Sequence, residues 1–422
     1  MSHNLHAAQL SENTDSGALR LNVISSLGQI PIEGATVSIS YSGSPDDVIQ
    51  ELTTDISGLT PTVELPAPPL EYSLEPESTV QPYADYNITI TAPGYEPVEI
   101  TGSELLPEVT SIQPVRMNPL EITEDEEKFV DIPPHTLWGS YPSKIPEAEI
   151  KPIPESGEIV LSRVVIPEYI VVHDGVPTDR SANNYWVKYT DYIKNVASSE
   201  IYATWPESTI YANVLAIMSF TLNRVYTEFY RNMGYNFTIT SSTAYDQKWI
   251  YGRNTYENID RLVDSIFVNY LSRPGVRQPI FTSYCDGQRV TCSGLSQWGS
   301  KALGDEGYSG IEIIRYYFGN DMYINSADII SGVPSSWPGY NLTEGSSGEK
   351  VRQLQQQLNR IAQNYPAIPT LIADGIYGSQ TAESVRTFQQ IFDLSPTGVT
   401  DFATWYAISR IYVAVSRIAE PE

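Results

Sequence analysis

The sequence predicts a multidomain protein with an all-β sandwich at the front, an α+β domain in the middle and a small helical domain at the end. At 422 residues the chain exceeds the length of a single core. Alternating β-branched segments fill the first part, whereas apolar residues at helical spacing first appear after Pro206 and again after Gly339. The parts we expect are a disordered N-terminus (1–17), a sandwich (18–118), an acidic linker (119–165), a central domain (166–338) and a C-terminal domain (339–422).

Period-two alternation rich in β-branched residues predicts the sandwich. It is clear at Leu19–Ile24 and Asn87–Ala92, and turn residues such as Pro93-Gly94 separate the segments. About seven short strands at this spacing are typical of an antiparallel sandwich. The stretches Pro31–Ile39 and Thr54–Gly58 resemble those of transthyretin-like, carboxypeptidase-regulatory-like domains, a resemblance that implies the same sandwich fold.

The segment after the sandwich changes in composition. Glu121–Glu127 is an acidic run, and six prolines follow between Pro133 and Pro154. This composition predicts an extended, exposed linker of the kind that proteases reach.

The central domain begins where the polarity drops, near Val164. A long helix is predicted from Pro206 to Gly234, because apolar residues recur there at helical spacing and form a core-facing stripe. The stripe consists of Ile210, Val214, Ile217, Leu222, Val225 and Phe229. Two further helices are expected at Tyr256–Leu271 and Leu295–Leu303, and strands at Pro279–Cys285 and Asp321–Ile324.

The C-terminal domain contains two predicted helices around a tight turn at Asp374–Gly378. Their apolar faces carry Val351, Leu354, Leu358 and Ile361 in the first helix, and Ala382, Val385, Phe388 and Ile391 in the second. The order of Gly345–Leu354, Asp374–Gly378 and Pro396–Gly398 resembles the peptidoglycan-binding-1 family. That resemblance implies a three-helix module that binds cell-wall glycan or stem peptide, so peptidoglycan is the expected partner.

The net charge of −26 is concentrated at the front of the chain. Residues 1–160 carry 5 Lys and Arg against 26 Asp and Glu, a net charge of −21, and the remaining 20 against 25 leave −5. This excess argues against nucleic acid and anionic membrane as partners. Neither a signal peptide nor a run of eighteen apolar residues is visible, so we expect no membrane span.

The only two cysteines are Cys285 and Cys292, whose spacing suits either a hairpin disulfide or two free thiols. Without nearby histidines they do not complete a four-ligand zinc site.

Glu200 is the best single candidate for chemistry. It is a lone carboxylate just ahead of the long apolar helix, in a region without histidine. Packing against Ile201, Tyr202 and Trp205 would leave the carboxyl poorly solvated and raise its pKa toward neutrality, which suits proton transfer. The plain alternative is an exposed glutamate near a helix start.

The segment Ser293–Gly319, with its Ser-Gln-Trp-Gly turn and its Glu-Ile-Ile-Arg-Tyr-Tyr end, resembles the signature of the stage II sporulation protein D (SpoIID) family. The Glu200 segment fits the family's other motif, and the resemblance covers residues 166–325. Family members are peptidoglycan lytic transglycosylases whose motif glutamate is the acid/base, which implies that role for Glu200. Lysozyme-like hydrolysis normally needs two carboxylates, whereas a transglycosylase can use one.

Departures from the family pattern define the remaining candidates. Ala244–Tyr251 stands where many members carry a metal-binding His-Cys pair, so no metal or other cofactor is expected. The family's helix arginine is replaced within Ile217–Phe220, and Arg224, two turns on, is its candidate substitute. Asp246, Gln247, Tyr251, Ser296 and Gln297 are candidates for substrate binding, with turn or packing roles as the alternative. Asp246 is also a candidate second acid.

The whole arrangement resembles the SleC family of clostridial spore cortex-lytic enzymes. That resemblance implies an inactive precursor located in the spore, made without a signal peptide, whose substrate is muramic-lactam-containing cortex peptidoglycan. It also implies activation by a subtilisin-like germination protease, with the cut near Ser156–Val165, and the charge difference between the two parts fits a removable front.

Three alternatives belong to other classes. A zinc amidase needs several histidine and carboxylate ligands, but the chain has only His3, His6, His135 and His173. The same count argues against a Ser-His or Cys-His triad. A muramidase using Glu200 with Asp246, and a non-enzymatic wall-binding or amidase-modulating protein, both remain open.

Overall fold

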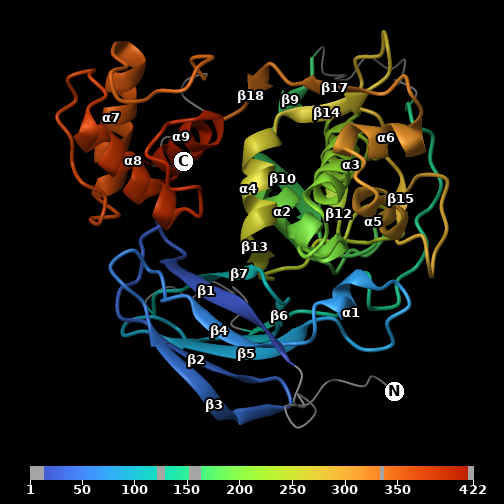
Figure 1. Ribbon diagram of the computed structural model, residues 1–422, viewed down its shortest axis with the longest axis horizontal. Coiled ribbons are helices and arrows are strands. Elements are labelled where there is room, and N and C mark those ends of the chain that lie inside the picture. The colour runs from blue at the N-terminus through green and yellow to red at the C-terminus, as the bar shows by residue number, and fades with distance from the viewer. Residues whose placement is uncertain (1–13, 121–128, 152–162, 333–336, 417–422) are drawn as a thin grey trace.

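The computed structural model describes residues 14–120, 129–151, 163–332 and 337–416, and its architecture is multidomain α+β (Figure 1). A β domain, drawn in blue, is formed by the N-terminal part of the chain. An α+β domain, coloured from green through yellow to light orange, lies above it, and a helical domain in dark orange and red lies beside the α+β domain, also above the β domain. The predicted disordered residues 1–17 lie mostly outside the described ranges, but β1 already begins at Asp15.

Two sheets enclose one apolar core in the β domain. Every second residue along β1 is buried, including Leu19, Leu21 and Val23, as the alternation predicts. The sandwich is not wholly antiparallel, however, because β1 pairs with β7, and β6 with β8, in parallel. One sheet has the order β13 (Thr255–Tyr256), β7 (Thr110–Met117), β1 (Asp15–Ser25), β4 (Val63–Ala67). The other has the order β3 (Ser44–Thr53), β2 (Thr36–Tyr41), β5 (Ala84–Thr91), β6 (Val98–Leu105), β8 (Phe129–Asp131), and the short helix α1 spans Glu71–Leu74.

The β domain and the central domain share a buried interface. The central domain contributes β13 to the first sheet, antiparallel to β7. The fully buried side chains of Glu104 and Arg253 form an ion pair of 2.9 Å across the boundary. The ring N–H of Trp205 donates to the carbonyl of Ser73 at 2.9 Å. Breaking a buried ion pair by removing one partner costs several kcal/mol, so this interface resembles a domain core.

The central domain is built around α3 (Glu207–Tyr226), which is buried along nearly its whole length (Figure 1). Beside it lie α2 (Tyr189–Glu200), α4 (Glu257–Ile266), α5 (Gln297–Asp305) and α6 (Gly310–Phe318). A three-stranded sheet has the order β11 (Asn184–Lys188), β10 (Tyr169–His173), β12 (Ile239–Thr240). Three strand pairs complete the domain: β14 (Asn269–Ser272) with β17 (Tyr323–Ser326), β15 (Tyr284–Cys285) with β16 (Leu295–Ser296), and β9 (Val165–Ile166) with β18 (Ile329–Ile330).

The helix boundaries differ from the predicted ones. The long helix ends at Tyr226, and Gly234, with φ of 87°, instead closes a short 3-10 helix at Arg231–Met233. The predicted helix Tyr256–Leu271 divides into α4 and β14, because the chain turns after Ile266 to pair with β17. Only the last two residues of the predicted strand Pro279–Cys285 pair as a strand.

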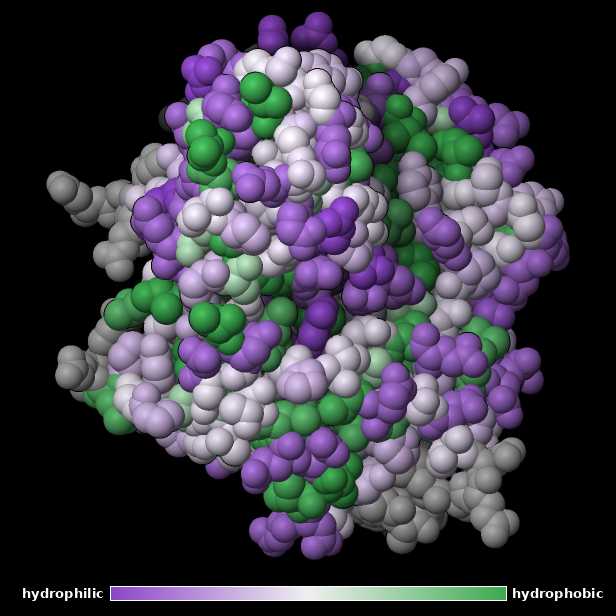
Figure 2. All heavy atoms as spheres, turned by 60° about the vertical axis from the view of Figure 1, so that its left-hand side comes forward, coloured by the Kyte–Doolittle hydropathy of each residue, from purple (hydrophilic) through white to green (hydrophobic). Residues whose placement is uncertain are grey.

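The C-terminal domain contains α7 (Glu349–Ala362), α8 (Ser379–Ile391) and α9 (Phe402–Ser416). It contacts α4 through α9, where the ring of Phe402 lies 5.5 Å from that of Phe267 and Arg410 pairs with Asp264 at 3.0 Å. Figure 2 turns this side of the molecule forward and shows apolar side chains along a furrow beside the upper lobe. Within the described ranges, no helix is long and apolar enough to cross a membrane.

The predicted linker is less exposed than its composition suggests. Residues 133–151 extend over the central domain with part of their side chains turned inward, and His135, Leu137 and Lys151 are buried. The expectation of a fully exposed linker is therefore wrong for this stretch. Most of the predicted cleavage region, Ser156–Val165, lies outside the described residues.

Candidate functional site

Glu200 is the last residue of α2, in which Tyr189, Ile193, Val196 and Ala197 recur at helical spacing and are buried. The side chain is buried, with 5% of the residue exposed. Ile201, Tyr202 and Trp205 follow it and are buried as well, so the expected apolar surroundings are present. The alternative of an exposed glutamate near a helix start is wrong.

Three donors hold the Glu200 carboxyl group. Its Oε1 accepts the backbone N–H of Lys248 at 2.8 Å and the hydroxyl of Tyr284 at 3.4 Å. Its Oε2 accepts the side-chain amide of Gln297 at 3.3 Å. The residues come from four segments far apart in the chain, so the tertiary fold sets the orientation of the carboxyl group.

Gln297 is positioned by the start of α5. Ser296 is the N-cap of this helix, and its Oγ accepts the backbone N–H of Gly299 at 2.9 Å. Cys285 and Cys292 form a disulfide, which settles the question that their spacing leaves open. Cys285 pairs with Ser296 between β15 and β16, so the bonded loop supports both Tyr284 and Gln297. Ser296 thus caps the N-terminus of α5, whereas Gln297 contacts Glu200.

Asp246 has a different environment from Glu200. It is fully buried, and its Oδ1 accepts from Arg224 at 2.7 Å. Its Oδ2 accepts from the Tyr230 hydroxyl at 2.6 Å and from the backbone N–H and hydroxyl of Thr240 at 2.9 and 2.7 Å. With both oxygens occupied inside the core, Asp246 is suited to structure rather than to substrate contact or acid catalysis. Arg224 belongs to this same network and not to the surroundings of Glu200.

Gln247 is also fully buried and internally bonded. Its Oε1 accepts from the hydroxyls of Tyr192 at 3.1 Å and Thr221 at 2.8 Å, and its amide donates to the carbonyl of Ile217 at 3.1 Å. Of the two roles considered for Gln247, substrate binding or packing, these internal bonds favour packing. Its backbone neighbour Lys248 supplies the N–H that reaches Glu200.

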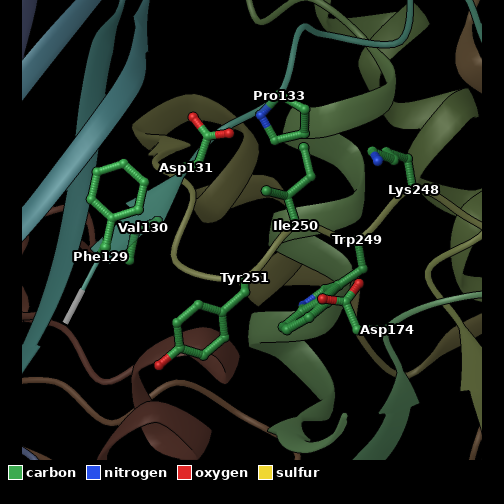
Figure 3. A pocket seen from close by; sticks show the side chains of 9 residues that line it. All are labelled: Phe129, Val130, Asp131, Pro133, Asp174, Lys248, Trp249, Ile250 and Tyr251. Carbon is green, nitrogen blue, oxygen red and sulfur yellow. The ribbon is translucent and has the colours of Figure 1, made fainter. Parts of the chain in front are cut away.

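A pocket of about 430 Å³ is lined in part by Lys248 and its neighbours Trp249 and Ile250 (Figure 3). Tyr251 borders this pocket, and its ring lies 4.8 Å from that of Tyr185. Figure 3 shows Phe129 and Asp131 on one side of the pocket and Lys248 on the other. The lining residues are Phe129, Val130, Asp131, Pro133, Asp174, Lys248, Trp249, Ile250 and Tyr251. Of the predicted substrate-binding residues, Tyr251 is the one that faces such open space.

Two lysines carry positive charge near Glu200. The amine of Lys144 lies 4.5 Å from the ring centre of Tyr284 and donates to the backbone carbonyl of Asp246. Burial lowers the pKa of Lys144 to about 8, although the Glu200 and Asp246 charges act in the opposite direction. Burial also lowers the pKa of Lys248, with Asp174 and Glu200 opposing the shift.

Sequence reasoning missed Tyr284, Lys248 and Lys144. Tyr284 stands next to Cys285, whose bonding the spacing left open, and a tyrosine in a strand carries no functional signal. Lys144 lies in a Pro-rich segment whose composition predicts an exposed linker. Among the described residues, no group of three or more His, Cys, Asp or Glu side chains is arranged to hold a metal ion.

Comparison with known proteins identifies one part of the chain. Residues 347–408 match the PG_binding_1 family, the peptidoglycan binding domain. The chain is also 40% identical over 77 residues to the zinc D-Ala-D-Ala carboxypeptidase of Streptomyces albus G. That match covers 18% of this chain and 28% of the relative, so the chain spans little more than a quarter of the relative's length.

Solved structures show only distant likeness. The TIE protein of Bacillus anthracis matches 25% of this chain and 17% of its own, with 15% identity and a TM-score of 0.17. The minor pilin GBS52 of Streptococcus agalactiae matches 27% and 49%, with 15% identity and a TM-score of 0.19. The 5-hydroxyisourate hydrolase of Klebsiella pneumoniae matches 24% and 90%, with 16% identity and a TM-score of 0.17. Together with the match at residues 347–408, the three helices α7 to α9 establish that the chain carries a C-terminal peptidoglycan-binding domain.

Proposed function

We propose that this cell-wall-associated protein is the precursor of a peptidoglycan lytic transglycosylase, with Glu200 as its single general acid/base. The observation that carries the proposal is the contrast between two buried carboxylates. The carboxyl group of Glu200 accepts hydrogen bonds from three uncharged donors. The carboxylate of Asp246 instead forms an ion pair with Arg224. A mechanism that needs one carboxyl therefore suits this site better than one that needs two.

The chemistry proceeds in two steps with one group. Protonated Glu200 donates its proton to the glycosidic oxygen, and the bond from that oxygen to muramyl C1 breaks. The muramyl C6 hydroxyl then attacks C1 and passes its proton to the Glu200 carboxylate. The product is a 1,6-anhydro-muramyl end, no water is consumed, and Glu200 returns to its starting state. Tyr284 and Gln297 keep the carboxyl group oriented through both steps.

The resemblance to the SleC family supports the finer part of the proposal. The substrate would be muramic-lactam-containing cortex peptidoglycan of the spore, and the peptidoglycan-binding domain would hold the enzyme on it. A subtilisin-like germination protease would remove the front of the chain and so activate the enzyme.

The test is digestion of purified cortex peptidoglycan by the protease-cut full chain, with products separated and weighed by mass spectrometry. Anhydro-muramyl ends are expected from the wild type. Glu200→Gln should lower their rate of formation about 10²- to 10⁴-fold, the usual contribution of a general acid/base. The matched control is Glu207→Gln, an exposed glutamate in the first turn of α3, which should retain full activity.

Other outcomes would replace the proposal. Reducing ends instead of anhydro ends would indicate a muramidase. Cortex lysis that Glu200→Gln leaves unchanged would indicate a wall-binding or amidase-modulating protein.

A further inference from the structure

Residues 133–151, here called the strap, cross the central domain beside the Glu200 site. At one end, the backbone N–H and the hydroxyl of Thr136 both donate to the carbonyl of Ser199, at 3.2 and 2.7 Å. Further along, the backbone N–H of Ile145 donates to the carbonyl of Ala244 at 2.7 Å. Figure 1 shows the teal-green chain after the β domain rising along the side of the central domain that carries β15.

The middle of the strap places a cation over the wall of the site. The amine of Lys144 lies 4.5 Å from the ring centre of Tyr284 and 4.6 Å from that of Phe220. Tyr284 is the residue whose hydroxyl donates to Glu200. A single aromatic ring therefore lies between the strap amine and the candidate acid/base. Cation–π contacts of this kind hold a lysine more firmly where water is excluded.

The far part of the strap is anchored by charge. Both carboxylate oxygens of Glu147 accept from Arg224, at 2.6 and 2.9 Å, and Lys151 pairs with the same glutamate at 2.8 Å. Beyond this point the carbonyl of Glu149 accepts the backbone N–H of Phe281 at 2.8 Å. Bidentate arginine–carboxylate pairs are among the strong polar contacts in proteins.

These contacts show that an extended segment of the chain lies against the central domain next to Glu200. The carbonyl of Ser199 and the ring of Tyr284 both contact the strap, so they present a hydrogen-bond acceptor and an aromatic surface. A glycan chain offers hydroxyl donors and apolar ring faces, which match those groups in kind.

We propose that the strap occupies the groove that receives the glycan chain, and that it excludes this substrate from Glu200 until it leaves. This inference rests on the proposed function and adds the physical means of regulation. In the uncut chain the strap is tied at both ends, to β8 before it and to β9 after it, so its effective concentration over the groove is high. A cut in the predicted region Ser156–Val165 frees one end, and the strap then competes with the substrate as a singly tethered segment.

The experiment uses the uncut full chain as wild type, as Glu147→Lys and as Asp305→Lys. Lysine at position 147 faces Arg224 and should expel the strap. Asp305→Lys is the matched control, because Asp305 also pairs with a cation, Lys301, but at the exposed end of α5. One readout is coupling of an amine tag to Glu200 with a water-soluble carbodiimide, quantified by peptide mass. The other is release of soluble fragments from cortex peptidoglycan.

Both readouts should rise at least about tenfold in Glu147→Lys, since like charges placed together at an interface repel each other. Neither should change in Asp305→Lys. If Glu147→Lys does not fold, Thr136→Val removes the hydroxyl bond to Ser199 without adding charge and should give a smaller rise in both.

Two results would contradict the proposal that the strap blocks access to Glu200. In one, Glu200 is tagged equally in the wild type and in both strap variants. In the other, Glu200 becomes accessible and the cut wild type is active, while the uncut strap variants stay inactive. If no form releases fragments, the cut wild type included, the proposed function fails, and the tagging result alone decides whether the strap covers Glu200.

Discussion

Glu200 and Asp246 are both buried carboxylates in the central domain, but their surroundings differ. Asp246 is paired with Arg224 and receives four donors at 2.6 to 2.9 Å. Glu200 receives two side-chain donors at 3.3 and 3.4 Å besides one backbone N–H at 2.8 Å. The comparison shows that burial does not separate the two groups, because both are buried. They differ in the number and charge of their partners, and this difference makes Glu200 the better candidate for chemistry.

The largest effect should come from Asp246→Ala, which leaves Arg224 buried beside Glu147 only. Removing one partner of a buried ion pair costs about 3–5 kcal/mol in the free energy of unfolding. Urea denaturation followed by intrinsic fluorescence measures this loss. Glu200→Gln should change the same quantity by no more than about 1 kcal/mol, because an amide oxygen can still accept the Lys248 N–H. Equal losses of the free energy of unfolding in the two variants would contradict the structural role assigned to Asp246 alone.

A pH experiment tests the cation beside the Glu200 site. The pKa of Lys144 is about 8 in the folded protein and ordinarily 10.5, so folding disfavours the charged amine. The stabilising contribution of this group is therefore fully present above pH 10.5 and is lost as pH falls through 8. The free energy of unfolding of the wild type, taken relative to Lys144→Met, should rise between pH 8 and 10.5. Since Lys144 is partly exposed, we expect a rise on the order of 1–2 kcal/mol.

The control for that experiment is Lys144→Arg, because a guanidinium stays charged throughout this window. The difference between Lys144→Arg and Lys144→Met should not follow pH. A flat difference for Lys144→Met would show that the amine is solvated in the folded chain.

The smallest effect is expected from removing one tyrosine hydroxyl group beside each carboxyl group, that of Tyr284 beside Glu200 and that of Tyr230 beside Asp246. Tyr284→Phe removes the 3.4 Å bond to Glu200 and should lower the rate of cortex cleavage by the cut chain about three- to tenfold, because a long hydrogen bond contributes little. It should also shift the pH profile of that rate, as expected of a residue that positions the acid/base. Tyr230→Phe removes the 2.6 Å bond to Asp246 and should lower stability without moving the profile. The opposite pattern would assign the working carboxyl group to Asp246.

Local patterns predicted some features because short-range physics decides them. The alternation in β1 is reproduced as alternating burial, and the heptad-like faces of α7 and α8 are buried at Val351, Leu354, Val385 and Phe388. The order of Gly345–Leu354, Asp374–Gly378 and Pro396–Gly398 predicts the peptidoglycan-binding domain, and the family match at residues 347–408 confirms it. Helix ends were predicted less well, since the turn after Ile266 depends on pairing between β14 and β17, which are far apart in sequence.

By itself, the sequence determined the acidic front and the peptidoglycan-binding end, because these depend on composition, spacing and local motif, and it singled out Glu200 as a candidate. Only the tertiary structure decided which carboxyl groups are neutralised, that the two cysteines are bonded, and that the strap lies beside Glu200. The physical reason is that ion pairs, aromatic contacts and hydrogen bonds between distant segments have no signature in either segment alone. Lys144 and Tyr284 are 140 positions apart, and only folding brings the amine of one over the ring of the other.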